Sequence, residues 1–477
     1  MAKDTTRYQC SACEHVELRW MGKCPSCGAW NTLEETRVAA SGGADKAPVR
    51  RAAAQRSDTN RVLARPTPIG QVPRPEIERR PVEPEELSRV LGGGLVPGSL
   101  LLLGGAPGVG KSTILTQLCG QLARRGDRVV YLSAEESAAQ VRGRAERLGA
   151  EHERFLLVEQ PVLERVLPGL YDDPPQLLVV DSIQTVISEE LESTPGLVSQ
   201  IRSCGSLLAD FARTTGCAVV MVGHVTKEGE LAGPRVLEHL VDTVLYFEPQ
   251  EDASVRMVRA FKNRFGRTGE LAVLEMTEKG LRPVRDASAL FLAGRRQGET
   301  GSAVTCIVSG TRPLLVEVQA LLVPSQYGTP TRVVTGIDTK RVAQLAAILE
   351  ARGDIQLIGN DVYVKVAGGL RLADPAADLA LVLAMASSLR EMPLPADLIA
   401  LGEVGLTGEL RRTAQVELRL EEARAHGFRR ALVAGHDPKA APRVDGIAVE
   451  FVSTVRDALR IAFETPPVAG RAAGERS

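Results

Sequence analysis

Residues 105–112 read Gly-Ala-Pro-Gly-Val-Gly-Lys-Ser and follow an apolar run at residues 99–103. This order fits the P-loop pattern, in which glycine N–H groups cradle phosphate oxygens, a lysine reaches the β- and γ-phosphates and a hydroxyl ligates Mg²⁺. Lys111 and Ser112 hold the last two positions, and a helix is expected from about Thr113, its positive dipole end toward the phosphates. The sequence therefore predicts a site for a nucleoside triphosphate and Mg²⁺. The expected nucleotide contacts are Gly104, Gly105, Ala106, Pro107, Gly108, Val109, Gly110, Lys111, Ser112 and Thr113.

Carboxylates follow two further β-rich runs. Residues 128–133 are followed by Glu135 and Glu136, and residues 176–180 are closed by Asp181. At the carboxyl end of a strand near the P-loop strand, a carboxylate can polarise the attacking water or hold Mg²⁺ directly or through water. Each acid could instead cap a helix that follows its strand. We assign Mg²⁺ to Asp181 and the attacking water to one of the two glutamates.

Two later segments carry groups that could sense or bind phosphate. Residues 218–223 form a β-rich run that ends at His224, where a polar side chain could respond to the γ-phosphate; a satisfied surface or core histidine is the alternative. Lys262 and Arg264 flank an asparagine at the end of another expected strand. Such a pair is often a solvated basic turn, but it could reach a phosphate on DNA or on a nucleotide held by a neighbouring subunit. We therefore take His224 as a sensor candidate and leave both targets of the basic pair open.

Four of the eight cysteines stand near the amino terminus in two Cys-x-x-Cys pairs. Cys10 and Cys13 form one pair, Cys24 and Cys27 the other, and ten residues separate them. Four thiolates at this spacing can close a tetrahedron around Zn²⁺. A module of this size lacks a core of its own, so the metal would supply folding energy and have a structural role. A redox role is the alternative, but no thioredoxin-like βαβ pattern surrounds the pairs.

Length and composition bound the remaining possibilities. A chain of 477 residues has room for about two to four domains. Its net charge of -1 argues against a wholly basic nucleic-acid coat, but residues 37–80 hold ten Lys or Arg against four Asp or Glu and lack an apolar period. The amino terminus has no signal-peptide pattern, and no apolar run reaches about 18 residues. We therefore expect a cytoplasmic protein with no membrane contact and with a flexible basic linker.

The alternation of β-rich runs with helical segments predicts an α/β fold with a largely parallel sheet around the P-loop, followed by a second α/β unit. The amino-terminal cysteine module and a tail rich in Pro, Gly and Ala complete the chain. The expected divisions are a zinc module at 1–36, a flexible basic linker at 37–80, an ATPase domain at 81–286, a second α/β domain at 287–464 and a disordered tail at 465–477.

Several motifs together resemble one family. They are the four-cysteine module, the P-loop, Tyr-Leu-Ser-Ala-Glu-Glu-Ser at residues 131–137 and Lys-Asn-Arg-Phe-Gly at residues 262–266. In this combination, nearly the whole chain is similar to the bacterial RadA (Sms) family of DNA repair proteins. The resemblance implies a RecA-like ATPase core in a homo-hexameric ring. It also implies that single-stranded and branched DNA and the RecA recombinase are partners.

The resemblance further implies roles for individual residues. Glu135 matches the catalytic glutamate, because RecA-like cores carry this acid two residues beyond the end of the strand; Glu136 is the competing choice. Lys262 and Arg264 match the motif that serves DNA-coupled ATP turnover, and the loops after Asp181 and His224 would face DNA. The residues that match the family's nucleotide and magnesium contacts are Lys111, Ser112, Thr113 and Asp181.

The second α/β unit looks like the proteolytic domain of Lon protease. That enzyme uses a serine nucleophile activated by a lysine. Here Ala376 stands at the serine position and Glu417 at the lysine position, and an alanine cannot attack a peptide bond. We therefore expect a scaffold rather than a protease. Cations of this domain that could contact DNA, or could be ordinary surface residues, are Arg312, Lys340, Arg341 and Lys365.

The sequence as a whole favours a DNA-dependent ATPase of homologous recombination that moves branch points or unwinds recombination intermediates. Two other classes remain as alternatives. One is a RecA-like ATPase that signals or remodels proteins without a DNA track. The other is an ATP-dependent protease of Lon type, which Ala376 and Glu417 disfavour.

Overall fold

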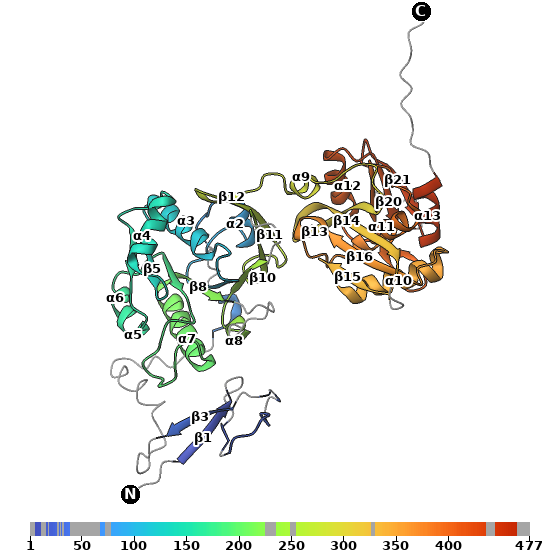
Figure 1. The fold of residues 1–477 in the computed structure, drawn as a ribbon. Coiled ribbons are helices and arrows are strands. Elements are labelled where there is room, and N and C mark those ends of the chain that lie inside the picture. Colours follow the sequence, from blue (N-terminus) through green and yellow to red (C-terminus); the bar gives the residue numbers. More distant parts are fainter. Residues whose placement is uncertain are drawn as a thin grey trace, which may run out of the picture.

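The computed structural model describes residues 5–10, 16–17, 19–25, 28, 30, 33–38, 67–71, 78–224, 235–248, 254–325, 330–435 and 444–464. Near the amino terminus, β1 (Thr5–Cys10), β2 (Val16–Glu17) and β3 (Leu33–Val38) form a three-stranded antiparallel sheet in the order β2-β1-β3 (Figure 1). Of the expected linker at 37–80, the structure describes the end of β3, residues 67–71 with the short helix η1 (Ile69–Gln71), and residues 78–80, which lead into the next unit. The expected tail lies outside the described residues.

A nine-stranded sheet with the order β12-β11-β10-β9-β4-β8-β7-β5-β6 forms the centre of the unit that carries the P-loop. Strands β4 to β9 run parallel to one another, whereas β10, β11 and β12 add an antiparallel edge next to β9. The helices and strands of this unit are α2 (Glu85–Val90), β4 (Leu100–Gly105), α3 (Lys111–Arg124), β5 (Val129–Ser133), α4 (Ala138–Arg147), β6 (Phe155–Val158), α5 (Leu163–Val166), α6 (Pro168–Tyr171), β7 (Leu177–Asp181), α7 (Val198–Thr215), β8 (Ala218–His224), α8 (Arg235–Glu238), β9 (Thr243–Glu248), β10 (Val255–Asn263), β11 (Leu271–Thr277) and β12 (Gly280–Pro283).

Helices cover both faces of this sheet. Apolar side chains of α2, α3 and α4 pack with one face, and those of α5, α6, α7 and α8 pack with the other. The strands β4, β5 and β7 are therefore buried along their whole length. Strands buried on both faces read as continuous apolar runs, which explains the pattern in the sequence. Helix α3 begins at Lys111, two residues before the start expected from the sequence.

The carboxyl ends of the parallel strands meet at one edge of the sheet. Gly105 at the end of β4 is paired with His224 at the end of β8, and Ser133 at the end of β5 is paired with Asp181 at the end of β7. Ligands of open α/β sheets bind outside the carboxyl ends of the strands. This topology gathers the predicted nucleotide-site residues at one edge.

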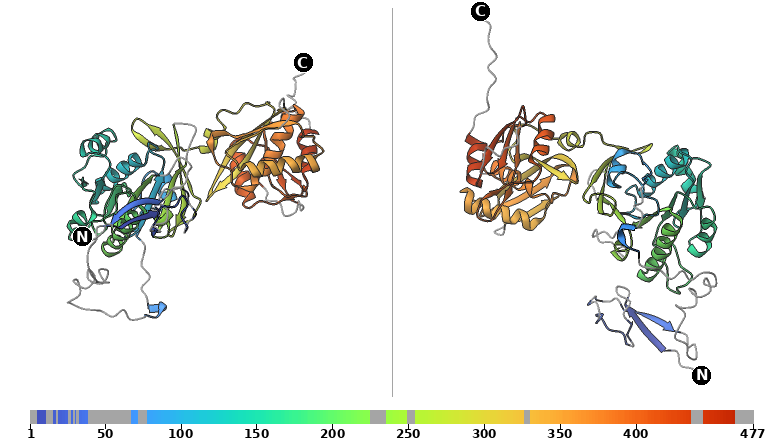
Figure 2. Two further views of the ribbon diagram at one scale, coloured as in Figure 1. Left: turned by 60° about the horizontal axis from the view of Figure 1, so that its bottom comes forward. Right: turned by 180° about the vertical axis from the view of Figure 1, so that it is seen from behind.

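A seven-stranded mixed sheet with the order β15-β16-β14-β13-β17-β20-β21 forms the second α/β unit. Figures 1 and 2 show this unit beside the P-loop unit, with α9 and β13 close to the antiparallel edge of the larger sheet. Its helices and strands are α9 (Ala287–Leu292), β13 (Ser302–Ser309), β14 (Arg312–Pro324), β15 (Arg332–Thr335), α10 (Thr339–Gly353), β16 (Asn360–Val366), η2 (Ala367–Gly369), η3 (Pro375–Ala377), α11 (Asp378–Arg390), β17 (Leu398–Leu401), β18 (Glu403–Val404), β19 (Leu410–Arg411), α12 (Val416–Ala425), β20 (Arg430–Ala434), β21 (Ala448–Val452) and α13 (Val455–Glu464).

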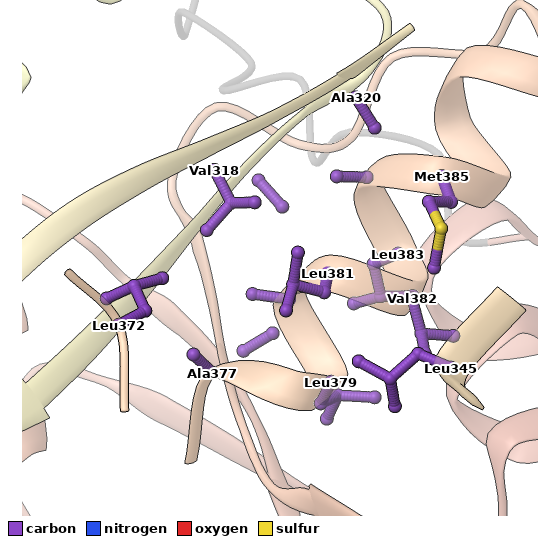
Figure 3. Close-up of a cluster of buried hydrophobic side chains, with 14 of the residues drawn as sticks. Val318, Ala320, Leu345, Leu372, Ala377, Leu379, Leu381, Val382, Leu383 and Met385 are labelled. Atoms are coloured by element: carbon purple, nitrogen blue, oxygen red, sulfur yellow. The ribbon is translucent and has the colours of Figure 1, made fainter. Parts of the chain in front are cut away.

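Helix α11 is the centre of this second unit. It is apolar on all sides, and its residues from Asp378 to Ser387 are buried. Figure 3 shows Leu379, Leu381 and Leu383 of the helix among Val318 of β14 and Leu345 of α10. A helix that is apolar all round belongs in a protein interior. Among the residues that the structure describes, no helix is both long and apolar enough to span a membrane.

The two units share an interface. Val255 and Met257 of β10 belong to the same apolar cluster as the core around α11. An ion pair at 2.8 Å joins the Arg312 guanidinium at the start of β14 to the Glu86 carboxylate in α2, and both side chains are largely buried. The Arg259 guanidinium of β10 donates to the Ser309 hydroxyl of β13 at 2.7 Å. The second sheet is therefore fastened to the antiparallel edge of the first.

Candidate active site

The P-loop turns from β4 into α3 with an open outer surface. Residues 106–108 are exposed, and Gly108 and Gly110 have φ angles of 74° and 115°, in the left-handed region that favours glycine. Lys111, by contrast, is only 4% exposed, and its ammonium donates to the carbonyls of Gly105 at 2.8 Å and Ala106 at 2.9 Å. Burial lowers the pKa of Lys111, an effect that nearby carboxylates oppose. The lysine thus lies folded over its own loop.

The Asp181 carboxylate is held by two hydroxyl groups from different elements. Ser112 in the first turn of α3 donates to Oδ2 at 2.8 Å, and Tyr131 of β5 donates to the same oxygen at 2.5 Å. Burial raises the pKa of Asp181, and these two hydrogen bonds oppose the rise. The structure therefore brings together the two residues that the sequence assigned to Mg²⁺.

The oxygen donors of Ser112 and Asp181 suit a magnesium ion. A hydroxyl has one proton and two lone pairs, so Ser112 can donate to Asp181 and still offer a lone pair to a cation. Hard oxygen ligands with space for water and phosphate oxygens are what Mg²⁺ prefers. When bound, Mg²⁺ would neutralise charge on the β- and γ-phosphates. The residues present fit the ion.

Glu135 contacts residues at the ends of two neighbouring strands, β7 and β8. It accepts a hydrogen bond from the Ser182 hydroxyl at 2.7 Å, and its carboxylate lies 3.1 Å from Nε2 of His224. The bond with His224 is the main reason that the pKa of Glu135 lies below its usual value; burial opposes it and the bond from Ser182 adds to it. The Lys111 ammonium lies 3.3 Å from Nδ1 of the same histidine. With the ring proton on Nε2, one histidine connects the P-loop lysine to this glutamate.

Glu136 faces a different partner. Its carboxylate forms an ion pair with Arg144 of α4, and its backbone carbonyl accepts from the Ser133 hydroxyl at 2.6 Å. Neither contact involves the P-loop. Of the two neighbouring glutamates, Glu135 is the one whose carboxylate points toward Lys111 and His224.

Lys262 and Arg264 lie at the other end of the sheet from the P-loop. Asn263 between them is paired with Thr243, which is paired with Leu101 at the start of β4. With a rise of roughly 3.3 Å per residue, the length of β4 alone puts about 16 Å between this turn and the loop. The structure thus does not bring the basic pair to the nucleotide site of its own chain.

Local contacts hold this basic turn, residues 262–266. The Lys262 ammonium donates to the carbonyls of Glu238 at 2.5 Å and Val241 at 2.7 Å. Burial and the neighbouring guanidinium lower the pKa of Lys262. The guanidinium of Arg264, which is 55% exposed, lies 3.1 Å from Oδ1 of Asp242. Asp242 Oδ2 also accepts from the backbone N–H of Leu100, at the start of the P-loop strand.

The amino-terminal cysteines can be followed only in part. Cys10 and Cys24 are both buried and belong to one cluster with Tyr8. Cys13 and Cys27 lie outside the described residues. One cysteine from each Cys-x-x-Cys pair is thus brought close to the other, as a shared metal would require. Trp20 and Trp30 are largely exposed.

In the second unit, the residue matched to a protease serine is buried and cannot be reached from solvent. Ala376 in η3 is fully buried, whereas Glu417 on α12 is exposed. Two of the four cations considered for DNA contact are instead held within the chain: Arg312 pairs with Glu86, and Arg341 donates to the Asp378 carboxylate at 2.9 Å. The other two, which are exposed, are Lys340 and Lys365.

Sequence reasoning missed three residues that shape these sites. Tyr131 binds Asp181, Ser182 binds Glu135, and Asp242 binds Arg264. A tyrosine within an otherwise apolar run was a signal for the first, because a buried phenol needs a polar partner. The loop after His224, expected to face DNA, lies at residues 225–234, outside the described residues.

Family models match two parts of the chain. Residues 66–230 match the model described as an AAA domain, and residues 8–35 match the model described as a rubredoxin metal binding domain. Among solved structures, a KaiC-like protein from Pyrococcus horikoshii is 21% identical, with a TM-score of 0.38 over 44% of this chain and 99% of that chain. The first two matches support a nucleotide-binding ATPase unit and a metal-binding amino-terminal module.

Curated relatives match the chain from end to end. The DNA repair protein RadA of Bacillus subtilis is 45% identical over 96% of this chain and 99% of its own length. RadA of Pseudomonas aeruginosa is 45% identical over 97% of this chain and 100% of its own length, and RadA of Escherichia coli is 42% identical over 97% and 99%. Because these relatives are 42–45% identical to it over nearly its whole length, the chain belongs to the RadA family of DNA repair proteins.

Proposed function

We propose that this chain is a DNA-dependent ATPase of homologous recombination and repair that assembles as a ring and drives branch migration or unwinding of recombination intermediates. Membership of the RadA family and the AAA domain support a DNA repair ATPase. The proposed divisions are those expected from the sequence, with the ATPase domain at 81–286 and a Lon-like scaffold at 287–464. Zn²⁺ in the amino-terminal module and Mg-ATP at the P-loop are the proposed cofactors.

The P-loop site supplies the chemistry of this proposal. Lys111 neutralises phosphate charge, while Ser112 and Asp181 hold the metal that accompanies ATP. Glu135, whose carboxylate is ionised at neutral pH, orients the attacking water as general base. His224 bridges Lys111 and Glu135, so a phosphate that draws Lys111 away would change the contacts of Glu135. That response is the basis of its proposed role as a sensor.

The proposed ring is supported by one observation: Lys262 and Arg264 lie far from the P-loop of their own chain. Their charges suit a phosphate, and Arg264 is exposed. A head-to-tail contact between subunits would set this end of one sheet against the P-loop edge of the next. Each nucleotide site is then completed by a neighbour, which supplies the cation that stabilises the transition state.

Mixing two inactive variants tests this composite site. Lys111→Ala and Arg264→Ala should each abolish most DNA-stimulated ATP turnover. When the two are combined in equal amounts under conditions of subunit exchange, sites with one intact residue from each chain should restore about a quarter of the wild-type rate. The control mixture of Lys111→Ala with Asp181→Asn should stay inactive, because both changes damage the same half-site. Activity of Lys111→Ala alone, or no recovery in the first mixture, would contradict the proposal.

A separate experiment tests whether the protein acts on DNA. ATP turnover and strand migration should rise with single-stranded or branched DNA, and binding should weaken between low and high salt, because phosphate contacts release counterions. A protein whose turnover ignores DNA at both salt concentrations would instead fit the signalling or protein-remodelling alternative. The same branched substrates with and without the RecA recombinase test that partner, and mass measurement with ATP and DNA tests the hexamer.

A further inference from the structure

Tyr131 is a buried polar residue that the proposed chemistry leaves without a role. It is fully buried in the middle of β5, in the apolar cluster that includes Leu118 and Cys119 of α3. Its ring also lies 6.3 Å from that of Phe155 in the neighbouring strand. Within this apolar setting, the hydroxyl donates to Oδ2 of Asp181 at 2.5 Å.

Packing alone does not account for a tyrosine at this position. A phenylalanine would fill the same space without a polar group, whereas a buried phenol must be given a partner. Here that partner is a carboxylate, which accepts a stronger hydrogen bond than a neutral carbonyl does. The hydroxyl of Tyr131 therefore serves Asp181 rather than the core.

The two hydroxyls that bind Asp181 donate to the same carboxylate oxygen and leave the other oxygen for a cation or its water ligands. Both Tyr131 and Ser112 donate to Oδ2, and neither bond uses Oδ1. The terminal torsion of an aspartate is broad, so an unrestrained carboxylate samples many orientations. Ser112 must share its hydroxyl with the cation, whereas Tyr131, in the middle of the buried strand β5, has no such second task.

We propose that Tyr131 is a positioning residue for the ATPase reaction, holding the Asp181 carboxylate so that Oδ1 is presented to Mg²⁺ or to one of its water ligands. This inference rests on the proposed ATP hydrolysis at the P-loop. Outer-shell partners of metal ligands commonly contribute 10- to 100-fold to metal affinity or activity, roughly the effect expected here.

The test compares Tyr131→Phe with the control Tyr171→Phe. Each change removes one phenolic hydroxyl, but Tyr171 is 39% exposed and packs edge-on against Phe211, away from the P-loop residues. For Tyr131→Phe, the Mg²⁺ concentration that gives half-maximal turnover should rise about 10-fold and kcat should fall, while KM for ATP at saturating Mg²⁺ changes little. The control should behave as wild type. The affinity of Tyr131→Phe for a fluorescently labelled ADP should match that of wild type in EDTA. The increase in affinity that Mg²⁺ produces in wild type should be mostly lost in this variant.

Two outcomes would overturn the inference. One is an unchanged Mg²⁺ dependence in Tyr131→Phe. The other is a loss of ADP binding in EDTA together with a lower unfolding temperature, which would make Tyr131 a packing residue. A wild-type chain that hydrolyses no ATP would end the proposed function, yet the ADP-binding comparison would still decide the role of Tyr131.

Discussion

Oε1 of Glu135 lies 3.1 Å from Nε2 of His224, although 89 positions separate the two residues in the sequence. They meet because β5 and β8 end at the same edge of the larger sheet. Glu136, the adjacent residue, instead pairs with Arg144. This difference in partners divides the roles of two neighbouring glutamates.

Replacing each glutamate separately should give unequal losses of ATP turnover. Glu135→Gln should lower kcat by about 100-fold or more, because general base catalysis typically contributes that much. Glu136→Gln should stay within about 10-fold of wild type, since it weakens only the ion pair with Arg144. Steady-state kinetics with DNA present measures both. Equal losses, or a larger loss for Glu136→Gln, would reassign the base.

The ion pair between Glu86 and Arg312 should stabilise the joint between the two α/β units. Both side chains are largely buried, and Glu86 keeps Arg89 as a second partner, so Arg312→Ala should lower the free energy of unfolding by about 1–2 kcal/mol. The control is Arg456→Ala, whose partner Asp354 is mostly exposed; it should change stability by about 0.5 kcal/mol or less. Urea denaturation compares the two variants, and equal effects would contradict the expectation.

His426 should make stability depend on pH. Burial alone would lower the pKa of His426, but hydrogen bonds to the Glu422 carbonyl and to Asp286 outweigh it and raise the pKa. A raised pKa in the folded state means that the stabilisation is complete below the unfolded value of about 6.5 and is lost as pH rises through the folded value.

Relative to wild type, His426→Gln should therefore be less stable at pH 6 and closer to it at pH 8.5. The difference at pH 6 should be no more than about 1 kcal/mol, because Asp286 is half exposed and solvent screens the pair. Thermal unfolding of both proteins across this range measures the effect. A difference that grows with pH would show the opposite linkage.

The amino-terminal module should hold one zinc ion per chain. Protein purified without chelator should contain it, and Cys24→Ser should lose it, because three thiolates bind Zn²⁺ more weakly than four. Cys204→Ala is the control, because Cys204 is fully buried in an apolar cluster of the P-loop unit and burial raises the pKa of its thiol to about 12. Metal analysis decides between them. Wild-type protein without zinc would end this assignment.

Local patterns were enough to predict the P-loop and the strands that end beside it, because each of these parts is continuous in the sequence. The P-loop requires Lys111 and Ser112 to be neighbours, and apolar runs identify the strands that end at Asp181 and His224. Where those strand ends meet depends on the order of strands, which the sequence does not contain. The contact of Tyr131 with Asp181, 50 positions away, is invisible for that reason.

Surface charge was harder to interpret from the sequence. Arg341 stands in an amphipathic helical segment and looks available for DNA, but its guanidinium is bonded to the buried carboxylate of Asp378. Arg312 is likewise paired, with a residue 226 positions earlier. Whether a cationic side chain forms an ion pair depends on carboxylates that lie far away in the sequence. A local sequence pattern does not identify those carboxylates.

In the proposed ring, Asp242 would connect two nucleotides through each subunit. One oxygen of its carboxylate binds Arg264, which we propose contacts the neighbour's phosphate; the other binds the N–H of Leu100, the first residue of the strand that ends at the subunit's own P-loop. Loss of the neighbour's γ-phosphate would release Arg264 from that phosphate and, through Asp242, change the hydrogen bond at the start of that strand. We therefore expect the subunits of the proposed ring to hydrolyse ATP in order, each event preparing the next subunit for hydrolysis.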